Sequence, residues 1–270
     1  MSQDIPSKNE KRLKWKKLLE QSLDCPEDPQ IITDLKVSYR TAARPVRAYG
    51  IDKREYIVKG QQAGRQIIND QIIARLGWAI GAPVGEPQIV EIDSELLESD
   101  SLSEPESPFA YLTPGTAHGV VFIPECSDDR EGIRFARQKE NRKRFALLAV
   151  LFGWIGANDR QFIYKMSSPN LVFSVDHGHF FPSGPNWTIA TLQNALEPSI
   201  DEYLRSQCCL TESEINKALE PLKALEEEKI IEAVASPPIE WEITIEERVA
   251  LVEYLITRQE QISIAISLSS

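Results

Sequence analysis

Short runs of alternating apolar and polar residues mark the first part of the chain. They occur in IITDLKVSYR (residues 31–40) and in PVRAYGIDKREYIVKG (residues 45–60), where GIDKR is typical of a turn. PQIVEI (residues 87–92) and AHGVVFIPE (residues 117–125) add two short apolar runs of strand length. The pattern therefore predicts several strands in this part of the fold.

Helical spacing marks the other stretches. RQIINDQIIARLGWAIG (residues 65–81) places apolar residues every four positions and ends before a proline, and NRKRFALLAVLFGWIG (residues 141–156) is strongly apolar. Amphipathic helices dominate from about residue 189, with a capping box expected at Thr211. KNEKRLKWKKLLEQSL (residues 8–23) predicts a basic amphipathic helix. We interpret that helix as packing on its own domain rather than on a membrane or a partner.

A β-rich first third followed by a helical remainder predicts an α+β protein in two lobes. We expect residues 1–30 to form an N-terminal helical extension and residues 31–124 to form an N-lobe of antiparallel strands with one helix. Residues 125–270 would then form a mainly helical C-lobe that contains a β-hairpin. The acidic, serine-rich residues 93–108 predict a mobile insertion.

The net charge of −11 argues against broad electrostatic binding to nucleic acid or to anionic membranes. No run approaches the roughly 20 apolar residues that a membrane span needs, and the N-terminus lacks the apolar core of a signal peptide. The spacing of the four cysteines fits neither a disulfide framework nor a zinc site. We therefore expect a cytoplasmic protein with reduced thiols and no membrane span.

Two aspartates flank the predicted hairpin in GANDRQFIYKMSSPNLVFSVDHGHFF (residues 156–181). Asp159 lies in a polar turn after the apolar helix, and Asp176 ends the run LVFSV just before His177 and Gly178. A glycine at that place permits a close approach of backbone and ligand. One hairpin can thus direct two carboxylates toward the same metal-bound nucleotide, although aspartates are also common turn residues.

A lysine completes a possible phosphoryl-transfer site. Lys59 ends the half-buried run YIVK, and Asp70 follows eleven residues later, on the predicted helix. Transfer of a phosphoryl group from ATP needs a lysine on the phosphates, oxygen ligands for Mg²⁺ and a carboxylate near the attacking hydroxyl. The alternative for Lys59 alone is a strand-end lysine that reaches water.

The histidines do not favour a metal site. His177 and His179 flank Gly178, but the chain has only three histidines and no cysteines at ligand spacing, so a zinc site is disfavoured. We expect local hydrogen bonds from His177 and His179, and we interpret His118 as an ordinary loop residue.

The order of YIVK, INDQIIARLG, GANDRQF and FSVDHG resembles the HipA-like kinases, which share the protein-kinase-like fold. The resemblance covers roughly residues 35–185, and the helical tail with IEWEI and LVEYLITRQEQI is also similar to compact members of that family. It implies a bilobal fold with a β-rich N-lobe and a mainly helical C-lobe, and it implies ATP and Mg²⁺ as cofactors.

The resemblance also implies roles for single residues. Lys59 would hold the α- and β-phosphates and Asp70 would orient it. Asp159 would accept the proton of the substrate hydroxyl or orient that group, and Asp176 would be the principal Mg²⁺ ligand. The segment VVFIPE would be the hinge that contacts adenine, through Val121, Phe122 and Ile123.

The chain departs from the family pattern at two places. The usual metal-binding asparagine is replaced by Tyr164, so a shorter loop with Gln161 as the second metal ligand is expected, while Asn170 falls in the hairpin turn. The phosphate-covering loop SYRTAARP has no glycine, and Arg40 and Arg44 are the candidates to bind phosphate there.

Our leading hypothesis is an ATP- and Mg²⁺-dependent phosphotransferase that acts on a serine or threonine hydroxyl of a protein. Two alternatives stay open. One is a pseudokinase that binds a nucleotide or a partner, which the missing glycines and asparagine favour. The other is a kinase for a small molecule or a lipid head group.

Overall fold

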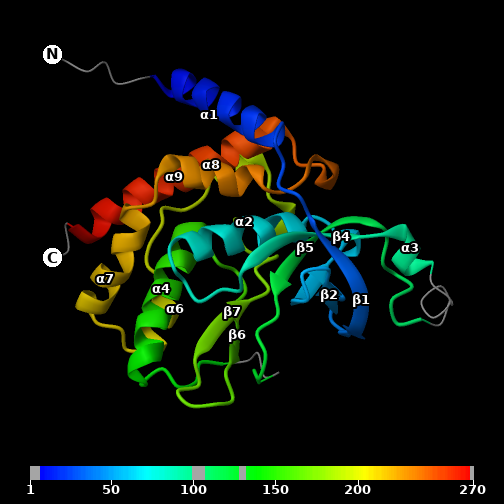
Figure 1. Cartoon of the computed structure of the whole chain (residues 1–270). Coiled ribbons are helices and arrows are strands. Elements are labelled where there is room, and N and C mark those ends of the chain that lie inside the picture. Colours follow the sequence, from blue (N-terminus) through cyan, green and yellow to red (C-terminus); the bar gives the residue numbers. More distant parts are fainter. Residues whose placement is uncertain (1–6, 99–106, 128–131, 268–270) are drawn as a thin grey trace.

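The computed structural model describes residues 7–98, 107–127 and 132–267 (Figure 1). Within those ranges, no helix combines the length and the apolar content that a membrane crossing requires. Residues 99–106, half of the expected mobile insertion, lie outside the described residues. Its first part is a single helical turn, α3 (Ser94–Leu97), which Asp93 caps by accepting from the backbone N–H of Glu95.

The predicted strands of the first part form a closed barrel. The strands are β1 (Gln30–Ser38), β2 (Val46–Gly50), β3 (Glu55–Lys59), β4 (Pro87–Ile92) and β5 (Gly115–Val121), in the order β1-β2-β3-β5-β4. The pairs are antiparallel except for β1 and β4, which are parallel. A closed ring of five strands cannot alternate in direction all the way round, so one parallel pair is unavoidable. The expected purely antiparallel arrangement is wrong in this one respect.

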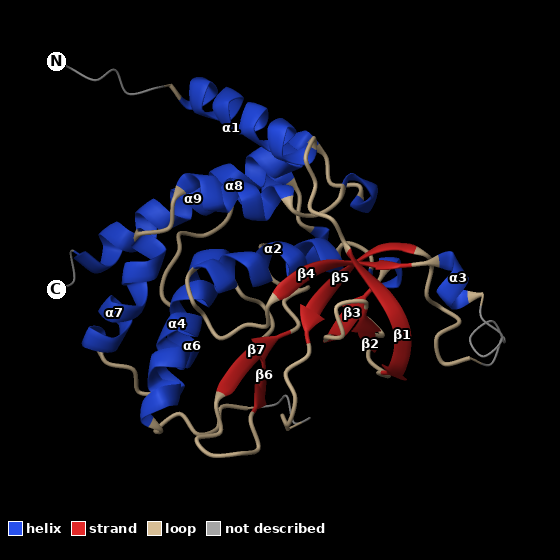
Figure 2. Cartoon of the chain, viewed as in Figure 1, coloured by secondary structure: helices blue, strands red, loops and turns tan. Residues whose placement is uncertain are grey.

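The helix α2 (Gln66–Ala79) lies between β3 and β4 in the chain and is buried along most of its length. The predicted hairpin is also present, as β6 (Gln161–Tyr164) and β7 (Val172–Val175). A hydrogen bond from the Ser174 N–H to the Pro83 oxygen fastens β7 to the segment after α2. This contact brings the hairpin beside the barrel (Figure 2).

The remainder of the described chain is mainly helical. Its helices are α4 (Lys139–Ile155), α5 (Ile189–Gln193), α6 (Glu202–Gln207), α7 (Glu212–Lys223), α8 (Glu227–Ala235) and α9 (Ile245–Ser267). The capping box predicted at Thr211 is present at the start of α7. One apolar core joins α2, α4 and the hairpin to the C-terminal helices, and a second fills the barrel. The chain is thus a mixed α+β protein, and its division into two lobes stays a prediction.

The N-terminal helix α1 (Lys8–Leu23) lies along α8 and α9 (Figure 1). Trp15 and Leu19 are buried in that contact, and Arg12 forms an ion pair with Glu253 of α9. The interpretation that this basic helix packs on its own chain is confirmed.

Candidate active site

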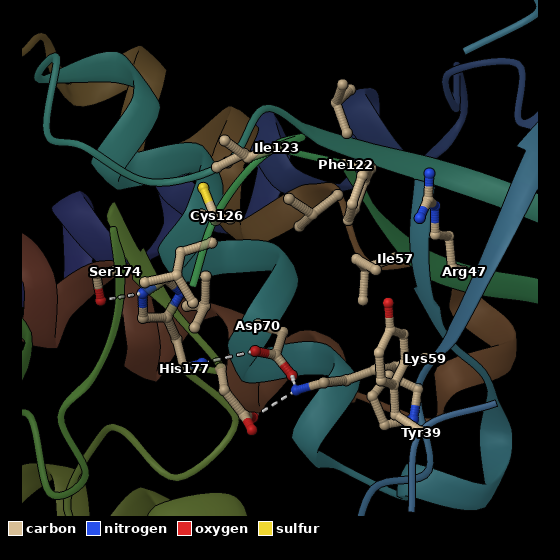
Figure 3. A pocket seen from close by; sticks show the side chains of 18 of the residues that line it. Tyr39, Arg47, Ile57, Lys59, Asp70, Phe122, Ile123, Cys126, Ser174 and His177 are labelled. Atoms are coloured by element: carbon tan, nitrogen blue, oxygen red, sulfur yellow. Dashed lines mark hydrogen bonds and ion pairs between the residues drawn. The ribbon is translucent and has the colours of Figure 1, made fainter. Parts of the chain in front are cut away.

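A cavity of about 410 Å³ opens between the barrel, α2 and the hairpin (Figure 3). Strands β3 and β5 form one wall, and β7 with the residues after it forms the other. The hinge residues named from the sequence line the cavity, together with Lys59, Asp70 and Asp176: they are Val121, Phe122 and Ile123.

Lys59 lies at the floor of this cavity with two carboxylates. Its Nζ is 2.8 Å from Asp70 Oδ2 and 2.5 Å from Asp176 Oδ1. The Lys59 side chain is only 7% exposed, which excludes a lysine that reaches out to water. Burial opposes its charged form, but Asp70 and Asp176 outweigh that cost and raise the pKa of Lys59. The predicted approach of Lys59 and Asp70 is confirmed.

Asp70 also holds the loop that carries Asp176. Its Oδ1 accepts a 2.7 Å hydrogen bond from the backbone N–H of His177. Burial disfavours the Asp70 carboxylate, but the neighbouring Lys59 ammonium prevails and lowers the pKa of Asp70. One buried carboxylate therefore fixes both the lysine and the residue that follows Asp176.

The backbone at Asp176 is in the left-handed region, with φ of 61°. That conformation is uncommon for a residue with a side chain, and the surroundings must enforce it. Two residues later, Gly178 packs closely on α2, because a Cβ there would lie 2.8 Å from Cβ of Gln66 and 3.1 Å from Oδ2 of Asp70. The glycine thus permits a close approach to α2, where the sequence suggested an approach to a ligand.

Asp159 and Gln161 lie at the same end of the hairpin as Asp176. Gln161 pairs with Val175 across the two strands, so Asp159 and Asp176 both lie just beyond that end. The Gln161 Nε2 donates to Asp159 Oδ2 at 2.8 Å. Neither Asp159 nor Gln161 is among the residues that line the cavity, so both lie outside its wall, at the Asp176 end of the hairpin.

Asn170 belongs to the turn of the hairpin, as expected. Its Nδ2 donates to the backbone oxygens of Lys165 and Met166, at 3.0 and 3.2 Å. The register of β6 and β7 puts this turn at the opposite end of the hairpin from Asp176. Gln161, and not Asn170, is the amide on the Asp176 side.

The two buried histidines are neutral structural groups. His177 Nε2 lies 2.9 Å from Ser174 Oγ, and burial lowers the pKa of His177 to about 4. The interpretation of His118 as a loop residue is wrong. It lies on β5 opposite Lys59, where its Nδ1 is 2.7 Å from Gln71 Oε1 and burial lowers its pKa to about 4. The alternation of β5 places Ala117 in the barrel core and turns His118 out of the barrel toward α2, where Gln71 pairs with it.

The loop between β1 and β2, which contains no glycine, carries the two arginines that were expected to bind phosphate. Neither Arg40 nor Arg44 lines the cavity, and the Arg44 guanidinium lies 5.2 Å from the centre of the Tyr111 ring. Tyr39 and Arg47 line it instead. The sequence analysis did not identify either residue. Arg47 pairs with Ile57, two positions before Lys59, so the side chains of Arg47 and Lys59 lie on the same face of the sheet.

Arg47 covers the hinge side of the cavity (Figure 3). Its guanidinium lies 3.9 Å from the centre of the Phe122 ring, and its Nε donates to Glu55 Oε2 at 2.9 Å. The backbone N–H of Phe122 donates to the backbone carbonyl oxygen of Glu55 at 2.8 Å. Ile123 is the next residue of the hinge, and it also lines the cavity.

The donor set suits a hard cation such as Mg²⁺, because Asp176, Asp159 and Gln161 offer carboxylate and amide oxygens at one end of the hairpin. The described residues contain no group of three or more histidine, cysteine or acidic side chains that would hold a metal alone. A cation would therefore complete its shell with nucleotide phosphates and water, which is usual for Mg²⁺.

Comparisons with known proteins point to one family. A family model described as HipA-like kinase matches residues 31–181, which is more than half of the chain. A search of curated proteins gave no match.

Solved structures with a similar fold include kinases. The proinflammatory kinase CtkA of Helicobacter pylori has a TM-score of 0.56 at 11% identity, over 88% of this chain and 95% of its own. Hydra Fam20, solved with sugar, has a TM-score of 0.52 at 13% identity, over 98% and 91%. A Golgi casein kinase with Mn/ADP bound has a TM-score of 0.51 at 11% identity, over 90% and 75%. At these identities the likeness establishes a kinase-like fold.

Proposed function

The chain belongs to the HipA-like kinase family, and we propose that it transfers the terminal phosphoryl group of ATP to a serine or threonine hydroxyl of a protein. The proposal includes the two-lobe arrangement, with residues 31–124 as the N-lobe, residues 125–270 as the C-lobe and residues 1–30 as an extension. The Mn/ADP in the Golgi casein kinase supports the use of a nucleotide and a divalent metal.

The convergence of Lys59, Asp70 and Asp176 carries the proposal. A buried ammonium with two carboxylates is costly to assemble for stability alone, because each charge loses its hydration. Here the trio lies on the floor of a cavity whose other end is the hinge. Clusters of charged groups with perturbed pKa values in a cavity are typical of catalytic sites.

The residues divide the work of phosphoryl transfer. Lys59 would leave Asp176 and bind the α- and β-phosphates, while Asp70 keeps it oriented. Ile123 would offer its backbone N–H to the adenine ring. Asp176 and Gln161 would hold Mg²⁺, which when bound neutralises phosphate charge. None of these contacts requires a glycine in the loop between β1 and β2.

Asp159 would act on the acceptor. Asp159 is half-buried at the Asp176 end of the hairpin, so a hydroxyl group that arrives from solvent can reach it, and Asp159 would orient that hydroxyl and accept its proton. The hydrogen bond from Gln161 Nε2 fixes one oxygen of Asp159 and leaves the other for the substrate. In this role Asp159 does not contribute to the affinity for ATP.

The proposal is tested by thermal-shift titration with ATP, with and without Mg²⁺, combined with an assay of ADP formation. We expect a metal-dependent rise of the melting temperature and ADP formation that increases with a protein acceptor. No shift under either condition would contradict nucleotide binding. ADP formation stimulated by a small alcohol or a lipid head group, but by no protein, would favour the small-molecule or lipid kinase.

A nucleotide-binding pseudokinase is the second candidate. It is favoured by the position of Asp159 and Gln161 outside the cavity lining, and by the engagement of Gln161 with Asp159 rather than with Asp176. A thermal shift that is the same with and without Mg²⁺, together with no ADP formation, would support it.

A further inference from the structure

Two asparagines bind the loop that follows Asp176, and each directly precedes a functional aspartate. Asn69 comes before Asp70 on α2, and Asn158 comes before Asp159 after α4. Neither asparagine lines the cavity. Their contacts nevertheless converge on one segment, residues 178–181.

The two side chains donate hydrogen bonds to alternate backbone oxygens of this segment. Asn69 Nδ2 donates to the oxygens of Gly178 and Phe180, at 2.8 and 3.1 Å. Asn158 Nδ2 donates to the oxygens of His179 and Phe181, at 3.1 and 2.6 Å. Four successive carbonyl groups are thus bound, two from each side.

A tryptophan fixes the orientation of the buried amide. Asn69 is fully buried, and its Oδ1 accepts a 2.9 Å hydrogen bond from Trp187 Nε1. An amide turned over by 180° would place Oδ1 against two carbonyl oxygens and its NH₂ against an N–H donor. Trp187 therefore selects the one orientation in which both donors of Asn69 face the loop.

We propose that Asn69 and Asn158 are positioning residues that set Asp176 relative to both Lys59 and Asp159. The proposal rests on the proposed function of the site, which it deepens. Asn69 binds the loop to α2, and the residue after Asn69 is Asp70, which pairs with Lys59. Asn158 binds the loop to the turn after α4, and the residue after Asn158 is Asp159. Two anchors on opposite sides hold the loop in place where Asp176 has its left-handed backbone.

The strain at Asp176 explains why such anchors are needed. A left-handed backbone is strained in a residue with a side chain, so the loop relaxes unless its surroundings prevent it. The N–H of His177 is held by Asp70, and the four carbonyl groups that follow residue 177 are held by the asparagines. Loss of the bonds from either asparagine frees this segment and lets Asp176 turn away from the position proposed for the metal.

The test uses Asn158→Ala and Trp187→Phe, each with a matched control. Asn194→Ala removes an asparagine that donates one 2.9 Å bond to a backbone oxygen in α5. Trp154→Phe removes a buried 2.8 Å bond from Trp154 Nε1 to the Leu255 oxygen. The controls lose bonds of the same kind elsewhere in the fold, so they report the effect of lost stability alone.

The first readout is hydrogen exchange in the protein without metal or nucleotide. We expect the amides of residues 177–181 to exchange about tenfold faster or more in Asn158→Ala and Trp187→Phe than in the wild type, and to be unchanged in both controls. Unchanged exchange in both test variants would overturn the two-sided anchoring. This readout does not depend on the protein being a kinase.

The second readout is the Mg²⁺ concentration at half-saturation of ATP binding, measured by thermal shift. Residues that orient metal ligands affect metal affinity by roughly 10- to 100-fold, so we expect a rise of about threefold to tenfold for these more distant anchors. ATP binding without metal should be unchanged. If the wild type shows no metal-dependent binding, the proposed function fails. If the wild type binds and both test variants keep its half-saturation, the positioning role fails.

Discussion

Replacing Asp70 with asparagine would remove one of the two negative charges that pair with Lys59. The change keeps the size of the side chain, and the amide oxygen still accepts the hydrogen bond from the His177 N–H. The Lys59 and Asp70 side chains are only 7% and 3% exposed, so water does not replace the lost partner. The variant therefore removes the charge pair with Lys59 and also places the amide NH₂, a donor, against the Lys59 ammonium in the position of Oδ2.

The expected cost follows from this geometry. Removal of one partner of a buried ion pair typically costs about 3–5 kcal/mol. Asp176 stays 2.5 Å from Lys59 and compensates part of the loss, so we expect a decrease of about 2 kcal/mol in the free energy of unfolding. Glu27→Gln is the matched control, because the exposed Glu27–Arg75 pair should contribute less than about 1 kcal/mol.

Urea unfolding of the wild type and both variants measures these values. The pKa of Asp70 is lower in the folded protein than in the unfolded chain, so its contribution is fully present above the unfolded value of about 3.9. It is lost as the pH falls through the lowered folded value, and the difference between the wild type and Asp70→Asn should shrink in that range. A cost at pH 7 no larger than that of Glu27→Gln would refute the reasoning.

Two further predictions concern the surroundings of the site. His118 and His177 have folded pKa values of about 4, below the unfolded value of about 6.5, so the stability of the fold should decrease as the pH drops from about 6.5 toward 4. His118→Gln should make this decrease smaller in pH-dependent thermal unfolding. An unchanged pH dependence would contradict the neutral buried state of His118. Gly178→Ala should lower the free energy of unfolding by about 1–3 kcal/mol, because the added Cβ meets Gln66 and Asp70, and a wild-type urea midpoint would show that the loop yields to a side chain.

The sequence was sufficient for the elements that local pattern determines. The alternating runs, the apolar helix α4, the hairpin and the capping box at Thr211 all follow from periodicity and from residue preferences at turns and caps. The ion pair of Lys59 with Asp70 was also predictable, since a lysine at the end of a half-buried strand needs a partner close by.

The sequence was insufficient where residues distant in the chain decide the environment. Closure of the barrel, with its parallel pair of β1 and β4, depends on how five strands meet around a ring. The buried position of His118 against α2 depends on Gln71, which is 47 residues away in the chain. The asparagine contacts to residues 178–181 join segments about 20 and 110 residues apart, which no local pattern encodes.

The central claim is that Asp176 holds the metal-bound nucleotide while Asp159 acts on the acceptor hydroxyl. The most direct test is to measure ADP formation and Mg²⁺-dependent ATP affinity for Asp159→Asn and Asp176→Asn. We expect Asp176→Asn to weaken both properties, because a negative charge beside the cation is lost. Asp159→Asn should lower turnover and leave ATP affinity nearly unchanged, because its contact forms mainly in the transition state. Wild-type turnover and affinity in both variants would contradict the account.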